Sequence, residues 1–266
     1  MDNGPHKAER EEEPARLPHV DALASAVLSI VAKKSHLSDS ARLRSLVDRL
    51  CDAVRDYDAT ARARMMAELA ALDIHPVEIT EVLIPAAARK LGEDWCSDAL
   101  SFADVTIGAA RLQAMLREMT DEILAGVVVP QNAPHVLIAV RCNEFHTLGA
   151  LVLSSHFRRR GVVVRLSLGQ SDGEIAQIID SGDYDAAMIS ASGGETLESL
   201  RNLVKIIRNG TEDAPPILLG GSVLEQKKDV KTLTGADYVT NDPDEALRLC
   251  GLKVPDRGVT TPPIEA

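Results

Sequence analysis

Apolar residues recur at intervals of three and four over the first part of the chain, which is the pattern of amphipathic helices. Helices are predicted at 20–34, 38–56, 59–72, 76–93 and 101–125. The last prediction is the clearest, because its apolar residues fall on a single stripe. That stripe comprises Val105, Gly108, Leu112, Met115, Leu116, Met119 and Ile123. Residues 21–126 are therefore expected to form a helical bundle of four or five helices.

A different pattern follows the break at 127–134. Short apolar runs alternate with amphipathic stretches, which is typical of βαβ units in a doubly wound parallel sheet. Residues 135–252 are therefore expected to form a flavodoxin-like α/β domain, whose ligands would lie beyond the carboxyl ends of its strands. The predicted strands are 136–140, 162–166, 186–189, 217–219 and 238–239, and helices are predicted at 174–180 and 197–207.

The two ends of the chain lack either pattern. Residues 1–20 hold few apolar side chains and are expected to form a disordered leader, and residues 253–266 are expected to form a loose tail. No stretch reaches the roughly 18 uninterrupted apolar residues of a membrane span, so neither membrane insertion nor export is expected. The four cysteines show no C-x-x-C spacing, which argues against a zinc site or a disulfide framework and favours the cytoplasm.

The net charge of -11 argues against nucleic-acid binding through a broad basic surface. The basic runs at 158–160 and 227–228 lie where helices are expected to end, and cations there complement the helix dipole. No helix-turn-helix pattern is recognisable. Contact with DNA is therefore expected to be at most indirect.

Candidate chemistry is concentrated directly after three of the predicted strands. An imidazole nitrogen is a good ligand for a transition metal, and a carboxylate bonded to the other ring nitrogen fixes the histidine tautomer. Glycines leave space beside the backbone, and serine hydroxyls both donate and accept hydrogen bonds. The three groups are Glu144-x-His146-x-x-Gly149, Ser190-Ala191-Ser192 and Gly220-Gly221. A phosphate-accepting receiver domain does not fit, because Ser190 stands where that class needs an aspartate.

Together these groups resemble the binding signature of cobalamin-dependent methionine synthase and of corrinoid carrier proteins. The spacing also matches, since 40 residues separate Gly149 from Ser190 and 27 separate Ser192 from Gly220. The resemblance implies a cobalamin cofactor with His146 as the ligand of the cobalt. Glu144 stands where that family usually has Asp, and Ser192 where it has Leu.

The resemblance also assigns roles to the other residues of the signature. Glu144 would hydrogen-bond the second ring nitrogen of His146. The nucleotide tail of the cofactor would run into the sheet, where small side chains leave a channel. The residues implied for this channel are Gly149, Ser190, Ser192, Gly220 and Gly221.

The helical half contains the single tryptophan of the chain, Trp95, which follows Leu91-Gly92 near a predicted helix end. Together with Ser101-Phe102-x-Asp104-Val105-Thr106-x-Gly108 and Arg111-Leu112-Gln113, this segment resembles the cobalamin-binding antirepressors of the AerR/PpaA family. The resemblance implies that the bundle caps the cofactor and that Trp95 covers its upper face. Related light sensors that hold adenosylcobalamin have a Glu-His pair where this chain has Val105-Thr106, so hydroxocobalamin is expected instead.

Three functions remain open at this stage. The first is a light-responsive regulator that is not an enzyme and that acts on a photosystem-gene repressor of the CrtJ/PpsR type, as the family resemblance implies. The second is a corrinoid methyl carrier of a methyltransferase system, which would leave the upper face open to methyl donors. The third is a degenerate domain that binds haem or nothing. A second imidazole from His6, His19, His36 or His75 is a further possible ligand of the upper face.

Overall fold

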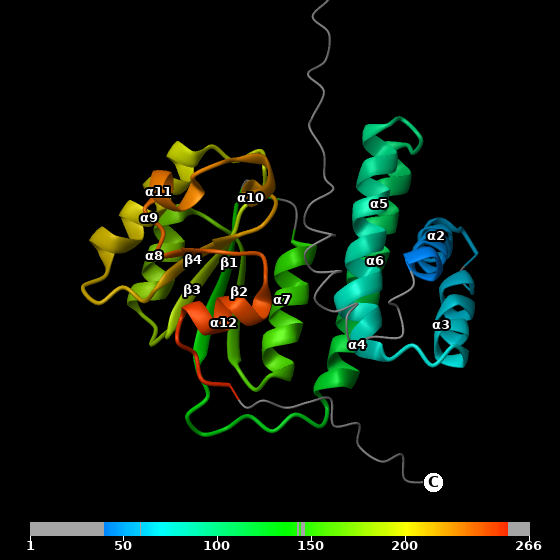
Figure 1. Cartoon of the computed structure of the whole chain (residues 1–266), viewed down its shortest axis with the longest axis horizontal. Coiled ribbons are helices and arrows are strands. Elements are labelled where there is room, and N and C mark those ends of the chain that lie inside the picture. Colours follow the sequence, from blue (N-terminus) through cyan, green and yellow to red (C-terminus); the bar gives the residue numbers. More distant parts are fainter. Residues whose placement is uncertain (1–39, 59, 143, 145–146, 255–266) are drawn as a thin grey trace, which may run out of the picture.

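A computed structural model of the chain describes residues 40–58, 60–142, 144 and 147–254. A helical bundle is followed by a parallel sheet of five strands with helices on both faces (Figure 1). This arrangement confirms the predicted fold class. The predicted leader, the helix at 20–34 and the end of the tail lie outside the described residues. Among the helices of the described ranges, none has the length and apolar character needed to cross a membrane.

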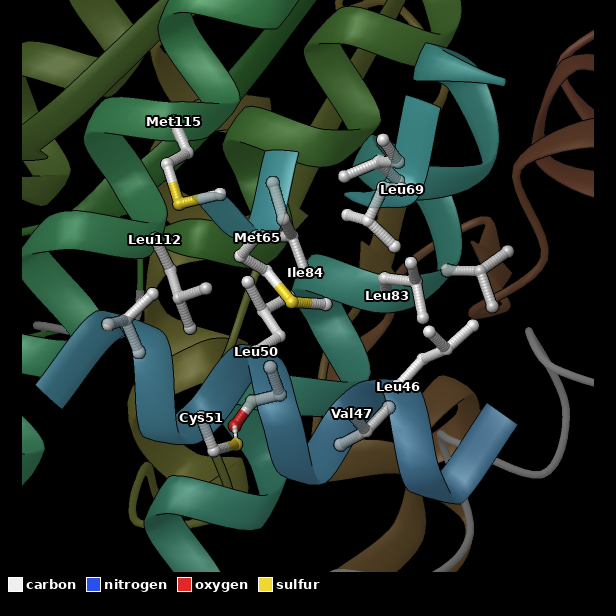
Figure 2. Packing of buried hydrophobic residues seen from close by; sticks show 14 of the residues in the cluster. Leu46, Val47, Leu50, Cys51, Met65, Leu69, Leu83, Ile84, Leu112 and Met115 are labelled. Atoms are coloured by element: carbon white, nitrogen blue, oxygen red, sulfur yellow. Dashed lines mark hydrogen bonds between the residues drawn. The ribbon is translucent and has the colours of Figure 1, made fainter. Parts of the chain in front are cut away.

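The bundle is built on amphipathic helices whose apolar faces meet in one core. Figure 2 shows Leu50 and Leu112 pointing into this core from two different helices. The stripe predicted for 101–125 is confirmed, because Leu112, Met115 and Leu116 are buried. The long helices of the bundle are α2 (Ser40–Arg55), α3 (Ala61–Ala71), α5 (Ile84–Cys96) and α6 (Phe102–Leu124).

The predicted single helix at 76–93 is instead three consecutive pieces. These are α4 (Pro76–Glu78), a π-helical turn η1 (Ile79–Leu83) and α5. Pro85 accounts for the interruption, because proline has no N–H to donate to the carbonyl of Glu81 four residues earlier and its ring crowds that carbonyl. The wider turn places the side chain of Glu81 in a buried position.

The sheet has the order β2-β1-β3-β4-β5, and all its pairings are parallel. Helices α7 and α12 cover one face, and α8, α9 and α11 cover the other. The strands are β1 (His135–Arg141), β2 (Val163–Gln170), β3 (Ala186–Ser190), β4 (Ile217–Gly220) and β5 (Tyr238–Val239). The helices are α7 (Leu148–Arg159), α8 (Asp172–Asp180), α9 (Leu197–Gly210), α10 (Val223–Gln226), α11 (Val230–Thr234) and α12 (Pro243–Leu249).

The second strand is longer than the predicted run at 162–166. Its pairing with β1 continues past a bulge, because Val140 faces Leu168 and Arg141 faces Gln170. Gly169 is the extra residue, and its positive φ of 76° is a conformation that glycine adopts without strain. The predicted run ends two residues before the apolar alternation ends at Leu168, and the pairing of Gln170 lies beyond that alternation.

Helix α7 lies between the sheet and the bundle and contributes to both cores (Figure 1). Ala150 and Phe157 are buried against the sheet. Leu148, Leu151 and Val152 pack against the core of the bundle. The two units therefore share one helix as a common wall.

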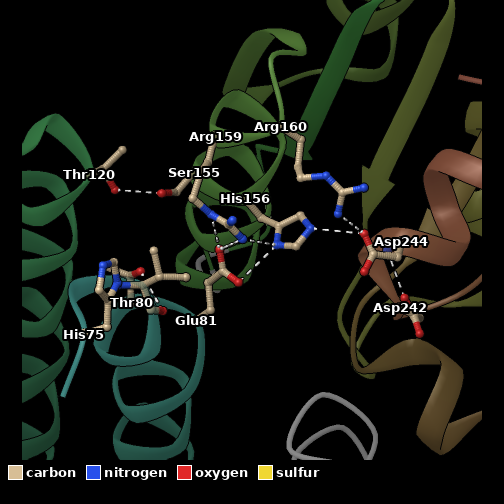
Figure 3. A network of polar contacts seen from close by, with 11 residues as sticks. His75, Thr80, Glu81, Thr120, Ser155, His156, Arg159, Arg160, Asp242 and Asp244 are labelled. Carbon is tan, nitrogen blue, oxygen red and sulfur yellow. Dashed lines mark hydrogen bonds and ion pairs between the residues drawn. The ribbon is translucent and has the colours of Figure 1, made fainter. Parts of the chain in front are cut away.

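A cluster of charged side chains ties the bundle to the α/β unit at the far end of α7 (Figure 3). Glu81 of η1 receives a hydrogen bond from Arg159 at 2.7 Å and lies 3.1 Å from Nδ1 of His156. On the other side, Nε2 of His156 lies 3.6 Å from Asp244 of α12, and Arg160 pairs with the same carboxylate at 2.5 Å. The cluster thus links three elements through buried or partly buried charges on the bundle side and the more exposed carboxylate of Asp244 on the other.

Candidate cofactor-binding site

The strand order defines where a ligand is expected to bind. The chain passes from β1 outward to β2 and then returns past β1 to begin β3, so the direction of winding reverses between β1 and β3. In open parallel sheets, ligands bind beyond the carboxyl ends of the strands at such a switch point. The segments directly after β1 and β3 carry Glu144 and Ser192, two of the predicted residues.

The register of the central strands aligns the predicted groups. Val140 faces Ser190, and Ser190 faces Gly220, so β1, β3 and β4 end at one level. Alternation along the strands sets Ser190 on the same face as Met188 and Leu218, which pack against α7 and α12. Ser190 and Gly220 therefore lie side by side on the face covered by α7.

Gly220 and Gly221 occupy positions that a side chain would not fit. A Cβ on Gly220 would lie 2.9 Å from the carbonyl oxygen of Thr240, and one on Gly221 would lie 2.3 Å from that of Ala191. Gly221 also has φ of 101°, and its N–H donates to Oδ1 of Asn241 at 2.7 Å. The turn after β4 thus lies directly against the segment that follows β3.

Gly149 and the two serines leave polar atoms and open space at the same edge. Gly149 lies in the first turn of α7 and is exposed, and among the described residues outside its own turn no atom lies within 4 Å of the position of an added Cβ. Within the described part of the chain, the hydroxyls of Ser190 and Ser192 make no hydrogen bond to another residue. The backbone N–H of Ser192 donates to Glu195 at 3.0 Å. These features are compatible with a ligand packed on the backbone of α7 and bonded by the serine hydroxyls.

The predicted metal ligand His146 lies outside the described residues, as do Asn143 and Phe145. Glu144 is described and is buried. Thr147, which follows His146, receives a hydrogen bond from Nε2 of Gln113 at 3.1 Å. Since Gln113 belongs to α6, the bundle directly contacts the segment that carries the predicted ligand.

Trp95 lies in the last turn of α5 and is 46% exposed, so it does not fill the core of the bundle. Its ring packs edge-on against Phe102, with 6.3 Å between the ring centroids. Figure 1 shows the turn between α5 and α6 at the same end of the molecule as the carboxyl ends of the strands. Within the described ranges, no hydrogen bond or ring contact joins Trp95 to the strand-end residues. His75 instead caps α4, where its Nδ1 accepts from the N–H of Val77.

Sequence reasoning missed a partly buried arginine at the switch point. Arg141 ends β1, and its guanidinium forms hydrogen bonds to Asp172, Glu195 and Ser199, all between 2.7 and 2.8 Å. An arginine directly after the apolar run 136–140 indicates an internal ion pair, since a charged side chain is buried only when it has partners. Its partners come from two other loops, which spacing alone does not identify.

A glycine-lined edge at the switch point of a parallel sheet is typical of α/β domains that bind a cofactor there. Residues 134–252 match the family model described as the B12 binding domain. The chain is also 35% identical, over 175 residues, to a 20.5 kDa protein of Rhodobacter capsulatus that is described as uncharacterized and lies in the bchF-crtJ intergenic region. This match covers 66% of the chain and 91% of the relative. The chain therefore belongs to the B12-binding domain family.

One further sequence match and one solved structure of similar fold are corrinoid proteins of Methanosarcina species. Trimethylamine corrinoid protein 2 of Methanosarcina mazei is 21% identical over 206 residues, covering 76% of this chain and 93% of the relative. The structure of the Methanosarcina barkeri monomethylamine corrinoid protein superposes with a TM-score of 0.61 at 13% identity. That match covers 77% of this chain and 97% of the other, and it shows a shared fold.

The described residues fit a bound cobalamin. Among the described residues, the space over Gly149 is open and the hydroxyls of Ser190 and Ser192 make no hydrogen bond, which suits a ligand that enters the sheet edge. The glycine pair at 220–221 keeps side chains out of the same edge. A buried carboxylate, Glu144, lies two positions from the predicted metal ligand.

Proposed function

We propose that the chain is a cobalamin-binding regulator of transcription, an antirepressor of the AerR/PpaA kind, rather than an enzyme. Its partner is a repressor of photosystem genes of the CrtJ/PpsR type, and it acts in the cytoplasm. The observation that carries the proposal is the position of α7, which begins directly after the predicted ligand segment and packs into both cores. A cofactor bound at the start of α7 therefore favours one arrangement of the bundle against the sheet.

Each residue of the site has a defined role in this proposal. His146 ligates cobalt, and Glu144 holds the imidazole in the required tautomer. Ser190 and Ser192 hydrogen-bond the nucleotide tail, while Gly149, Gly220 and Gly221 leave space for it. Trp95 covers the upper face. Cobalamin, as hydroxocobalamin, supplies a ring that absorbs visible light and a metal whose axial ligands exchange.

The relative from the bchF-crtJ intergenic region supports the link to photosynthesis genes, since it shares 35% identity with this chain. The methylamine corrinoid proteins support the second candidate, a corrinoid methyl carrier. The two candidates differ at the upper face. A carrier leaves this face open to a methyl donor, whereas a regulator covers it.

The binding step is tested by purifying the full chain with hydroxocobalamin, in the dark and in light, and recording its visible absorption spectrum. We expect retained corrinoid, and a spectral shift in the His146→Ala variant because the lower ligand is lost. His135→Ala is the matched control, since His135 is exposed at the start of β1. Absence of corrinoid from the purified chain would refute both candidates.

The regulatory step is tested by co-precipitation with a CrtJ/PpsR-type repressor, with and without bound cobalamin. We expect the captured amount to depend on cobalamin. Transfer of a methyl group from methylated corrinoid on this chain to a thiol acceptor, without any capture of the repressor, would instead establish the methyl carrier.

A further inference from the structure

Arg141 occupies the switch point on the face opposite to α7. Strand alternation sets its side chain with Leu137 and Ala139, which pack against α8 and α9. Ser190 lies on the other face. Arg141 therefore does not line the proposed path of the nucleotide tail, and any effect on that path acts through other residues.

The guanidinium of Arg141, at the end of β1, bonds to the segments that follow two other strands, β2 and β3. Its Nε and Nη2 donate to both oxygens of Asp172, the first residue of α8, at 2.7 and 2.8 Å. Its Nη1 donates to Glu195, after β3, and to Ser199 in the first turn of α9, both at 2.8 Å. A planar guanidinium is suited to such bidentate bonds, and a lysine does not reproduce them.

Glu195 links Arg141 to Ser192 through its two carboxylate oxygens. One of its carboxylate oxygens accepts from Arg141, and the other accepts from the backbone N–H of Ser192 at 3.0 Å. The side chains of Arg141 and Glu195 are 14% and 13% exposed, so water competes little for these bonds. Ser190 is fixed by its pairing with β1 and β4, and the N–H of Ala191 donates to the carbonyl of Gly220, so it is Ser192 whose position depends on this pair of charges.

We propose that Arg141 is a positioning residue that, through Glu195, holds Ser192 in the place required by the nucleotide tail. It would thereby make the chain prefer corrinoids with a tail to corrinoids without one. The inference rests on the proposed binding of cobalamin at this edge. A corrinoid without a nucleotide tail would be held by His146 and by the residues above its ring. Its affinity therefore does not depend on the position of Ser192.

The test compares dissociation constants of hydroxocobalamin and of aquacobinamide, which lacks the nucleotide tail, for the full chain and its variants. In Arg141→Met we expect the dissociation constant for cobalamin to rise by about tenfold or more, because charge-assisted bonds are lost. That for cobinamide should change by less than about twofold. Arg141→Lys should fall between the two proteins, and Glu195→Gln should shift the preference in the same direction.

The matched control is Arg208→Met. Arg208 pairs with Asp237 on the approach to β5, at the opposite end of the sheet, so both dissociation constants should stay unchanged. A second readout uses the chain without corrinoid: hydrogen exchange of the amide of Ser192 should be faster in Arg141→Met and unaltered in Arg208→Met.

Two results would overturn the role of Arg141. The first is an equal loss of affinity for both corrinoids in Arg141→Met, which indicates general damage to the fold. The second is unchanged affinity together with unchanged exchange at Ser192. Failure of the proposed function gives a different result, because the unaltered chain then binds neither corrinoid.

Discussion

Gly221 and Gly149 lie at the same edge of the sheet but differ in the space that each leaves for a side chain. Gly221 has no room for a side chain and adopts a left-handed backbone conformation, whereas the space over Gly149 is open. The first glycine is thus required by the protein itself. The second is required only if a ligand fills the space above it.

This difference predicts opposite changes in the free energy of unfolding for two substitutions. Gly221→Ala should lower the free energy of unfolding by about 1–2 kcal/mol or more, because alanine is strained at positive φ and meets Ala191. Gly149→Leu should keep or raise it, by up to about 1 kcal/mol, because leucine favours helix over glycine. Only the second should weaken corrinoid binding without cost to the unliganded fold. Denaturant unfolding and a corrinoid titration measure both effects, and full affinity in Gly149→Leu would contradict a ligand at α7.

The residues of the site differ in how far the sequence predicts them. Ser190 and Gly220 are predictable as neighbours, because apolar runs mark the ends of parallel strands and those ends meet at one edge. Arg141 and Gln113 are not predictable in this way. Their partners, such as Glu195 and Thr147, are distant in sequence, so only folding brings them together.

Helix α7 has two apolar faces, one packed on the sheet and one on the bundle. The two phenylalanines among the described residues differ in burial. Phe157 of α7 is fully buried against the sheet, whereas Phe102 at the start of α6 is 70% exposed beside Trp95. The two residues therefore allow the same substitution to be compared inside and outside a core.

Phe157→Ala should lower the free energy of unfolding by about 3–5 kcal/mol, since it removes a large buried side chain and leaves a cavity. Phe102→Ala, the matched control, should lower it by no more than about 1.5 kcal/mol, the value of its edge contact with Trp95. Urea unfolding followed by circular dichroism measures both. Similar losses in the two variants would contradict the burial of α7 against the sheet through Phe157.

Most helices and strands follow from apolar periodicity, but the local irregularities do not. The π-helical turn at 79–83 keeps the apolar pattern of an ordinary helix, and only Pro85 hints at the change. The bulge at Gly169 lies in an edge strand with no apolar alternation beyond Leu168. Both features depend on how backbone hydrogen bonds are shared, and periodicity reports only which side chains face the core.

For the whole molecule, the cluster around His156 links the stability of the bundle contact to pH. Burial lowers the pKa of His156, but the carboxylates of Asp244 and Glu81 outweigh it, so the pKa lies above its ordinary value of 6.5. Burial acts to raise the pKa of Glu81, and the cationic His156 and Arg159 bring it below 4.5. His156 is thus protonated in the folded protein over a range where the unfolded chain has lost the proton.

The sign of the pH dependence follows from these shifts. The contribution of His156 is fully present below pH 6.5 and is lost as pH rises through its raised folded-state pKa, whereas that of Glu81 is present above pH 4.5 and is lost on acidification. At pH 6, Glu81→Gln should lower the free energy of unfolding by about 3 kcal/mol, because it removes the buried carboxylate that His156 and Arg159 share. This difference should shrink as the pH is raised above 6.5.

The control is Glu68→Gln, the same substitution in the half-exposed pair with Arg49, which should cost at most about 1 kcal/mol. Urea unfolding across the pH range measures both variants. A constant difference between Glu81→Gln and the unaltered chain from pH 5 to the alkaline side would contradict a protonated His156.

The shared helix also limits how the α/β unit behaves when it is separated from the bundle. Leu148, Leu151 and Val152 form an apolar band that faces the bundle core and would face water in the fragment 134–252. Such a band promotes self-association. The bundle therefore keeps this apolar band of the α/β unit away from water. Replacing the bundle with an unrelated domain would require these three side chains of α7 to be changed as well.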